Sequence, residues 1–100
     1  MSRIIVGHAN EYRPGDRVIG AIDGAQRPGL VELVSARDQD ERPTSYEVRF
    51  LDHDGNDEIK IVTNEVLIWV SDAGLNKTEF LKLNPKALAR RYGKVASGSA

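Results

Sequence analysis

Short segments of alternating apolar and polar residues, separated by turn-forming residues, constrain the fold of this chain most. The clearest segment is 45–51, SYEVRFL, in which Tyr46, Val48 and Phe50 share one face and Glu47 and Arg49 the other. Alternation of this kind is typical of a strand with one buried face. Four further segments have strand-like composition: 16–22, 29–35, 58–62 and 66–70. Five short strands within about 55 residues predict a mainly β fold, a small five-stranded barrel.

The connections and strand faces can be predicted in part. Asp23-Gly24 is a hairpin signal, and we expect it to open a looser loop that runs through Pro28. In residues 29–35, Val31 and Leu33 share one face while Leu30 and Val34 point the other way, which predicts a bulge or burial on both sides. In residues 58–62, the two isoleucines lie opposite Lys60.

A C-terminal helical extension is predicted from capping residues and an apolar stripe. Asn76 is the expected cap of a first helix, and Asn84-Pro85 marks a second start because proline is favoured at the first helical position. The apolar residues of this region are Phe80, Leu81, Leu83, Ala87, Leu88 and Tyr92. We expect this stripe to cover an open end of the barrel; binding a partner or a second copy is the alternative. The predicted divisions are a flexible lead (1–11), the barrel (12–70), one helix or two short helices (75–93) and a disordered tail (94–100).

Composition and charge exclude several classes. The chain contains no cysteine, which excludes disulfides, cysteine zinc sites and thiol catalysis. We find no run of about 20 apolar residues and no signal-peptide core, so we expect no membrane contact and an intracellular location, nuclear in a eukaryote and otherwise cytoplasmic. Residues 1–70 hold eight basic and thirteen acidic side chains, whereas residues 71–100 hold six basic and two acidic ones. This asymmetry indicates an acidic body with a basic C-terminal arm.

The densest cluster of polar residues is 50–58, FLDHDGNDE. Asp52, Asp54 and Asn56 match positions 1, 3 and 5 of a calcium loop, but Asp57 and Thr63 stand where glycine and glutamate are required. A transition-metal site is equally unsupported, since the only histidines, at positions 8 and 53, have no third ligand at a recognisable spacing. We therefore predict a solvated hairpin turn, with no metal and no cofactor.

Catalysis is not indicated either. Carboxylates crowded on an exposed turn lack the two different environments that separate the pKa values of an acid and a base. The glycine-rich phosphate motifs GxGxxG and GxxxxGK[ST] are absent. We expect a protein that is not an enzyme.

The order of these motifs is similar to that of a known family. GDRV at 15–18, GLV at 29–31 and YEVRFLDH at 46–53 follow one another, and GNDE completes the third motif at 55–58. Over residues 12–70 this series resembles the Tudor domain and its Agenet and lamin-B-receptor relatives, which belong to the SH3-like barrels. KOW-type modules of transcription and ribosome factors share the first two motifs.

The resemblance implies a strongly bent barrel that binds a protein or peptide, with a histone-tail-like methylated Lys or Arg as one ligand class, in a chromatin or RNA-processing context. Such ligands sit against aromatic rings through cation–π attraction. The residues that correspond to the peptide site are Phe50, His53, Asp52, Asp23 and Tyr46. The cage is at most half present, because His53 replaces the family's tyrosine and residues 22–27 contain no aromatic.

The alternative is an SH3-like or KOW-type module that contacts DNA or RNA through its basic arm. Clustered Lys and Arg supply most of the sequence-independent affinity for nucleic acids. The residues of this candidate surface are Lys82, Lys86, Arg90, Arg91 and Lys94. The sequence predicts no oligomeric state.

Overall fold

The computed structural model describes residues 4–6, 11–52, 54–70 and 74–92, with the backbone alone described for 4–6, 68 and 69. Its strands are β1 (Ile4–Val6), β2 (Arg17–Ile22), β3 (Ala25–Arg37), β4 (Pro43–Leu51), β5 (Asp57–Thr63) and β6 (Leu67–Val70). A 3-10 turn, η2 (Asn64–Val66), precedes β6, and two helices follow it, α1 (Lys77–Leu81) and α2 (Pro85–Tyr92). The protein is thus mainly β with two short C-terminal helices, as predicted. In the described part of the chain, no helix is both long and apolar enough to cross a membrane.

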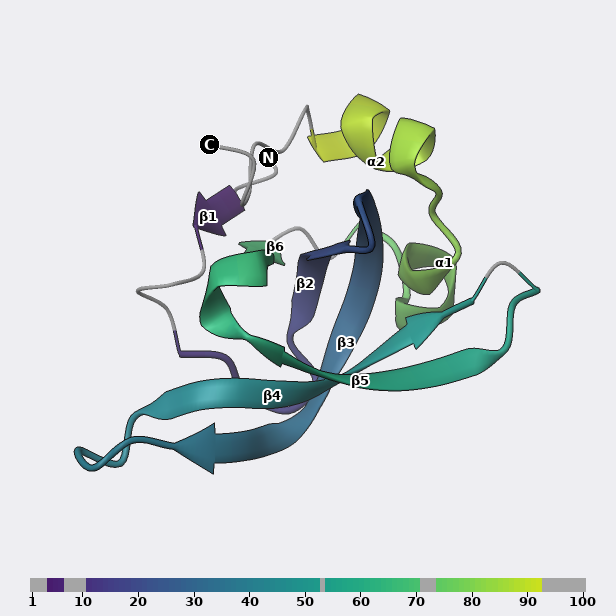
Figure 1. Ribbon diagram of the computed structural model, residues 1–100. Coiled ribbons are helices and arrows are strands. Elements are labelled where there is room, and N and C mark those ends of the chain that lie inside the picture. The colour runs from purple at the N-terminus through teal and green to yellow at the C-terminus, as the bar shows by residue number, and fades with distance from the viewer. Residues whose placement is uncertain (1–3, 7–10, 53, 71–73, 93–100) are drawn as a thin grey trace.

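The strands form one antiparallel sheet in the order β1-β6-β2-β3-β4-β5. The 13-residue β3 is the longest strand and pairs with β2 through its first half and with β4 through its second. Figure 1 shows the β4–β5 hairpin running across the direction of β2 and β6, so the sheet is strongly coiled. Within the predicted lead, Ile4–Val6 form β1, which pairs with β6. The rest of the predicted lead except residue 11, and the predicted tail at 94–100, lie outside the described residues.

The connection between β2 and β3 differs from the prediction. Ile22 pairs directly with Ala25, and Asp23 and Gly24 have φ values of 51° and 79°. Positive φ at both central residues of a two-residue hairpin matches the right-handed twist of the strands. The looser loop expected through Pro28 is therefore wrong, because this tight turn places residues 25–28 in β3, opposite β2.

A bulge, one of the two alternatives predicted for residues 29–35, is present in β3 as a register shift against β4 between Val31 and Leu33. The extra residue reverses the alternation of faces beyond that point. Val34 consequently packs against the same buried cluster as Val31, while Leu33 is 43% exposed. The prediction that Val31 and Leu33 share a face is wrong for this reason.

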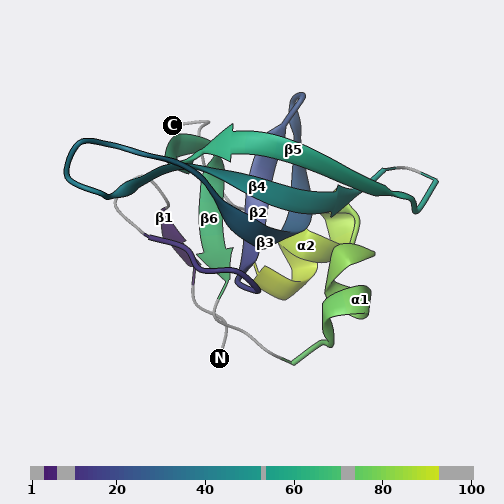
Figure 2. The same ribbon diagram turned by 90° about the horizontal axis from the view of Figure 1, so that it is seen from below.

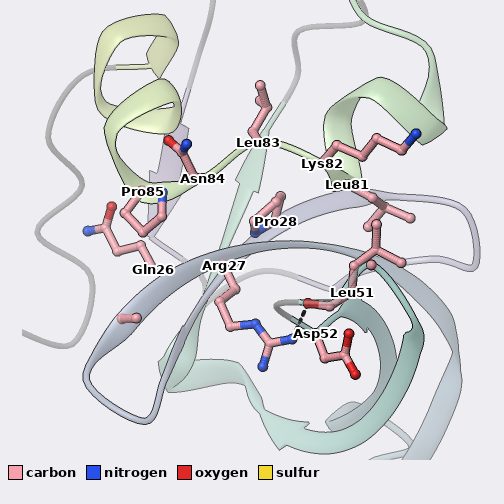
Figure 3. Close-up of a pocket in the computed structure, with 12 residues that line it drawn as sticks. Gln26, Arg27, Pro28, Leu51, Asp52, Leu81, Lys82, Leu83, Asn84 and Pro85 are labelled. Carbon is pink, nitrogen blue, oxygen red and sulfur yellow. Dashed lines mark hydrogen bonds between the residues drawn. The ribbon is translucent and has the colours of Figure 1, made fainter.

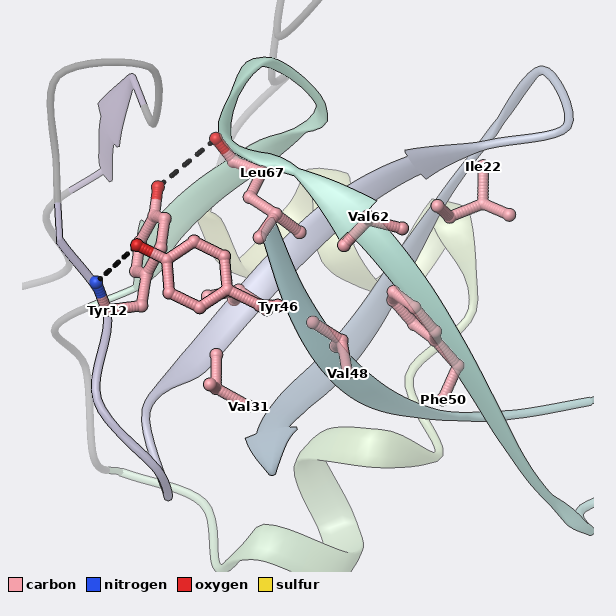
Figure 4. Close-up of a cluster of buried hydrophobic side chains, with 9 residues drawn as sticks. Tyr12, Ile22, Val31, Tyr46, Val48, Phe50, Val62 and Leu67 are labelled. Atoms are coloured by element: carbon pink, nitrogen blue, oxygen red, sulfur yellow. Dashed lines mark hydrogen bonds between the residues drawn. The ribbon is translucent and has the colours of Figure 1, made fainter. Parts of the chain in front are cut away.

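The concave side of the sheet encloses the inner cluster, shown in Figure 4 and formed by Tyr12, Val18, Ile22, Val31, Tyr46, Val48, Phe50, Val62 and Leu67. The predicted inward face of residues 45–51 is confirmed by complete burial of its three apolar side chains. Tyr12 and Tyr46 pack edge to face with ring centroids 5.2 Å apart, and the Tyr12 amide donates to the Tyr46 hydroxyl at 3.1 Å. Burial raises the pKa of the Tyr46 phenol above its ordinary value.

The two helices cover the opposite side of the sheet. Phe80, Leu81, Leu88 and Tyr92 form the helical cluster with Ile19, Leu30 and Val70. Figure 2 shows α1 and α2 lying beside the part of the sheet formed by β2 and β3. The expected cap is confirmed, since the Asn76 side chain accepts from the Glu79 amide at 2.8 Å while the Glu79 carboxylate accepts from the Asn76 amide. The apolar stripe therefore covers the sheet.

Candidate binding cleft

Phe50, the central residue of the predicted peptide site, lies inside the protein. Its ring is fully buried, and a Cβ at Gly29 would lie 2.7 Å from Phe50 Cε1, so only glycine leaves room for it. The Arg27 guanidinium lies over the ring, 5.2 Å from its centroid. Tyr46 is also fully buried, in the inner cluster. Neither ring is open to a ligand, and His53 lies outside the described residues.

The contact between Arg27 and Phe50 is of the cation–π type, the same type of contact that holds a cationic ligand against an aromatic ring. The Arg27 guanidinium donates to the Leu51 carbonyl and lies 3.4 Å from the Glu58 carboxylate. A guanidinium stacked on an aromatic face is attracted by the negative face of the ring. The cation that contacts the Phe50 ring is thus a side chain of the protein itself. The tight β2–β3 turn makes this contact possible, because it places Arg27 in β3.

The acidic stretch forms the turn that the sequence predicted. The Asp52 carboxylate accepts from the amides of Asp54 and Asn56, each at 2.9 Å, and the Gly55 amide donates to the Asp52 carbonyl at 3.0 Å. Gly55 has a φ of 84°, a value that side-chain-bearing residues rarely adopt. The carboxylate of Asp52 thus stabilises its own turn. Among the described residues, no three His, Asp or Glu side chains lie together as potential metal ligands.

Asp23, the fourth residue of the predicted site, lies at the exposed tip of the β2–β3 hairpin. Its carboxylate is 4.0 Å from the Lys60 ammonium, which lies 3.1 Å from the Glu58 carboxylate. The hydrogen bond from Lys60, together with the charges of Lys60 and Arg27, lowers the pKa of Glu58 below its ordinary value. Asp23 is therefore part of a surface charge network, and it does not line the cleft described next.

A cleft of about 470 Å³ lies where β3 begins, β4 ends and the α1–α2 connection passes over the sheet. Figure 3 shows Arg27 and Asp52 on its sheet side and the connection around Leu83 on the other. Its apolar wall comes from Pro28, Leu51, Leu81, Leu83 and Pro85. Its polar groups come from Gln26, Arg27, Asp52, Lys82 and Asn84.

Of the predicted peptide-site residues that the structure describes, Asp52 alone lines this cleft. Sequence patterns did not indicate the other lining residues, because they belong to elements separated by more than 20 positions along the chain. Lys82 was predicted only as part of a nucleic-acid surface. It is exposed, and among the described residues its ammonium has no hydrogen-bond or ion-pair partner.

The remaining basic residues of the arm lie on α2. Lys86, Arg90 and Arg91 are exposed, whereas Leu88 and Tyr92 of the same helix are buried. The Arg91 guanidinium lies 5.9 Å from the centroid of the Tyr92 ring. Lys94 lies outside the described residues.

Comparison of the chain with protein-family models, with curated proteins and with solved structures found no match.

Proposed function

We propose that the chain is a Tudor-like, SH3-type five-stranded barrel that acts as a non-enzymatic interaction module and binds a short peptide segment of a partner protein. The strand order β6-β2-β3-β4-β5, the coiling of the sheet and the 3-10 turn before β6 support the barrel. The cleft beside the α1–α2 connection carries the functional part of the proposal. Its volume falls in the range of about 300–1,000 Å³ that is usual for ligand sites.

The side chains of the cleft favour a ligand that places an apolar side chain next to a carboxylate. The leucines and prolines provide the apolar wall. The carboxylate of Asp52 is engaged by two backbone amides, and Arg27 is engaged by Leu51 and Glu58. Lys82 is the charged group at the rim that lacks a partner among the described residues, so it is available to an acidic group of the ligand.

A methylated Lys or Arg tail is the rival ligand, from the Tudor resemblance. Such a ligand would have to displace Arg27 from the ring of Phe50. The displaced Arg27 guanidinium would lose its contact with the ring, which reduces the net free energy of binding. An aromatic cage that is open before the ligand binds does not have this cost. The observed contact therefore favours the acidic peptide over the methylated one.

Three peptides test this ligand preference. They have the same uncharged sequence with one leucine and differ only in the residue next to it. They carry, next to the leucine, glutamate, glutamine or trimethyllysine, and their binding is followed by amide NMR shifts of the full chain. We expect the glutamate peptide to bind most tightly and to shift the amides of Leu51, Leu81 and Leu83. Lys82→Glu is expected to weaken it about fivefold, since an exposed charge pair contributes up to about 1 kcal/mol.

Lys86→Glu is the matched control, because Lys86 is also exposed but does not line the cleft. It should leave the affinity for the glutamate peptide unchanged. Equal weakening by both variants, or tightest binding of the trimethyllysine peptide, would contradict the acidic ligand. Absence of any shift at the cleft with all three peptides would remove the cleft as a binding site.

Nucleic-acid binding is the second candidate, and the composition of α2 favours it. The helix contains no acidic residue and exposes Lys86 and Arg90 one turn apart. We expect the double variant Lys86→Glu, Arg90→Glu to reduce the salt dependence of oligonucleotide binding by about two units of slope, one per lost phosphate contact. The measurement is fluorescence anisotropy at several salt concentrations, with Lys77→Glu on α1 as the control. Binding that is absent at low salt, or an unchanged slope, would exclude this surface.

A further inference from the structure

Three large apolar side chains are exposed on the outer face of the β3–β4–β5 part of the sheet. They are Leu33, Ile59 and Ile61, with exposed fractions of 43%, 50% and 66%. Leu33 and Ile61 both pair with Glu47 of the intervening strand, so they lie in one row across the sheet. Single exposed apolar side chains are ordinary, whereas a group on one face is typical of an interaction surface.

The two isoleucines belong to an edge strand. β5 is the last strand in the sheet order, and in the described part of the chain no other strand pairs with its free edge. A free edge presents unpaired backbone donors and acceptors to a further strand. β5 has seven residues and contains neither proline nor glycine, so its backbone is suited to pairing.

Charges on β5 decide which partner strand fits this edge. Glu58 and Lys60 point to the side opposite the isoleucines and lie 3.1 Å apart at their charged atoms. A lysine in the middle of an edge strand opposes pairing unless the partner strand places an acidic residue opposite it. A second copy of β5, antiparallel and with Ile59 opposite Ile59, matches this charge, because Glu58 of each copy then faces Lys60 of the other. Centring the pairing on Lys60 would instead place two ammonium groups opposite each other.

We propose that β5 pairs with β5 of a second copy of this chain, in the register that places Ile59 on the two-fold axis. The two sheets then form one continuous sheet across the dimer. The exposed apolar residues of both copies gather on its outer face, and two Glu58–Lys60 cross-strand pairs form on the other. This surface is separate from the cleft, and dimerisation does not depend on the proposed peptide binding.

Disulfide trapping tests the register, because the chain has no cysteine of its own. In Ile59→Cys, the two introduced residues are directly opposite, with Cα atoms about 4.5–5.5 Å apart, within the range of a disulfide. Ile61→Cys is the matched control: Ile61 faces Asp57 of the other copy, so the Cα atoms of its two cysteines are about 14 Å apart. We expect mild oxidation of the full chain to cross-link the first variant at least tenfold faster than the second. Equal rates, or faster cross-linking at position 61, would overturn the register.

Light scattering with size-exclusion chromatography tests the dimer without cysteines. We expect the unmodified chain to approach twice its mass of 11.0 kDa as its concentration rises. Glu58→Lys and Lys60→Glu should each weaken the dimer about tenfold, since two symmetric cross-strand pairs become repulsive, and the double variant should restore it. Circular dichroism checks that each variant is folded. A mass of 11.0 kDa at every concentration, together with no cross-linking at position 59, would overturn the proposal.

Discussion

Replacing Phe80 with alanine is expected to lower the free energy of unfolding by about 3–5 kcal/mol, the range for removal of a fully buried aromatic side chain. Phe80 has no exposed surface, packs with Ile19 and Leu30 in the helical cluster, and meets Tyr92 edge to face at 6.2 Å between ring centroids. Urea denaturation followed by circular dichroism measures the change. Thr78→Ala is the control: Thr78 is an exposed residue of the same helix, and its loss should change stability by less than about 0.5 kcal/mol.

The result for Phe80 also decides how the C-terminal region should be probed. If the helices cover the sheet as the burial indicates, deletion of residues 76–100 exposes the apolar side of β2 and β3 and unfolds or aggregates the chain. Loss of nucleic-acid binding on deletion would then say nothing about the basic arm, and charge-reversal variants are needed instead. A Phe80→Ala protein as stable as the unmodified chain would show that the helices contribute little to the fold.

The features that the sequence predicted well are those set by neighbouring residues. Residues 45–51 alternate strictly because one face is buried along their whole length, so the pattern alone predicts the inner face. The start of α1 follows from the reciprocal Asn76–Glu79 hydrogen bonds, which join residues three apart. The start of α2 follows from Pro85 and from Asn84, whose side chain accepts from the Ala87 amide at 2.8 Å.

The features that it predicted poorly are of two kinds. Some depend on which of two possible strand faces is buried, and others depend on contacts with residues far away in the sequence. Alternation in residues 58–62 separates the two faces of the strand but does not indicate which face is buried. In the structure, Val62 belongs to the inner cluster, and the two isoleucines are exposed on the outer face. In β3, a bulge is one of two predicted alternatives, but its position, and hence the face of Leu33, depends on the pairing with β4.

The candidate site shows the same limit. The alternation in residues 45–51 correctly predicted that Phe50 lies on the inward face of the third predicted strand, but it did not predict what contacts the ring. That contact comes from Arg27, 23 positions earlier, and requires the two-residue turn at Asp23 and Gly24. The cleft likewise depends on where α1 ends relative to Leu51, a distance that no local pattern encodes.

Phe50→Ala distinguishes a core ring from a ligand-binding ring. We expect it to lower the free energy of unfolding by about 3–5 kcal/mol, because the ring is fully buried against the inner cluster and beneath Arg27. A ring that lines an open cage would behave differently. Its removal would change stability by less than about 1 kcal/mol and abolish binding of a methylated peptide. Urea denaturation of the variant, beside a titration of the unmodified chain with a trimethyllysine peptide, separates the two cases.

Arg27→Met is the matched variant for this experiment, because it removes the guanidinium from Phe50 but keeps an apolar stem of similar reach over the ring. If Arg27 blocks a latent cage, this variant should gain affinity for trimethyllysine while the unmodified chain shows none. If Phe50 is simply part of the core, neither protein binds the methylated peptide. In that case, Arg27→Met only lowers the free energy of unfolding, by about 1–3 kcal/mol. The cause is the loss of the stacking contact and of the bonds to Leu51 and Glu58. Tight binding of trimethyllysine by the unmodified chain would show that Arg27 leaves the ring readily, and the acidic-peptide proposal would then have to be abandoned.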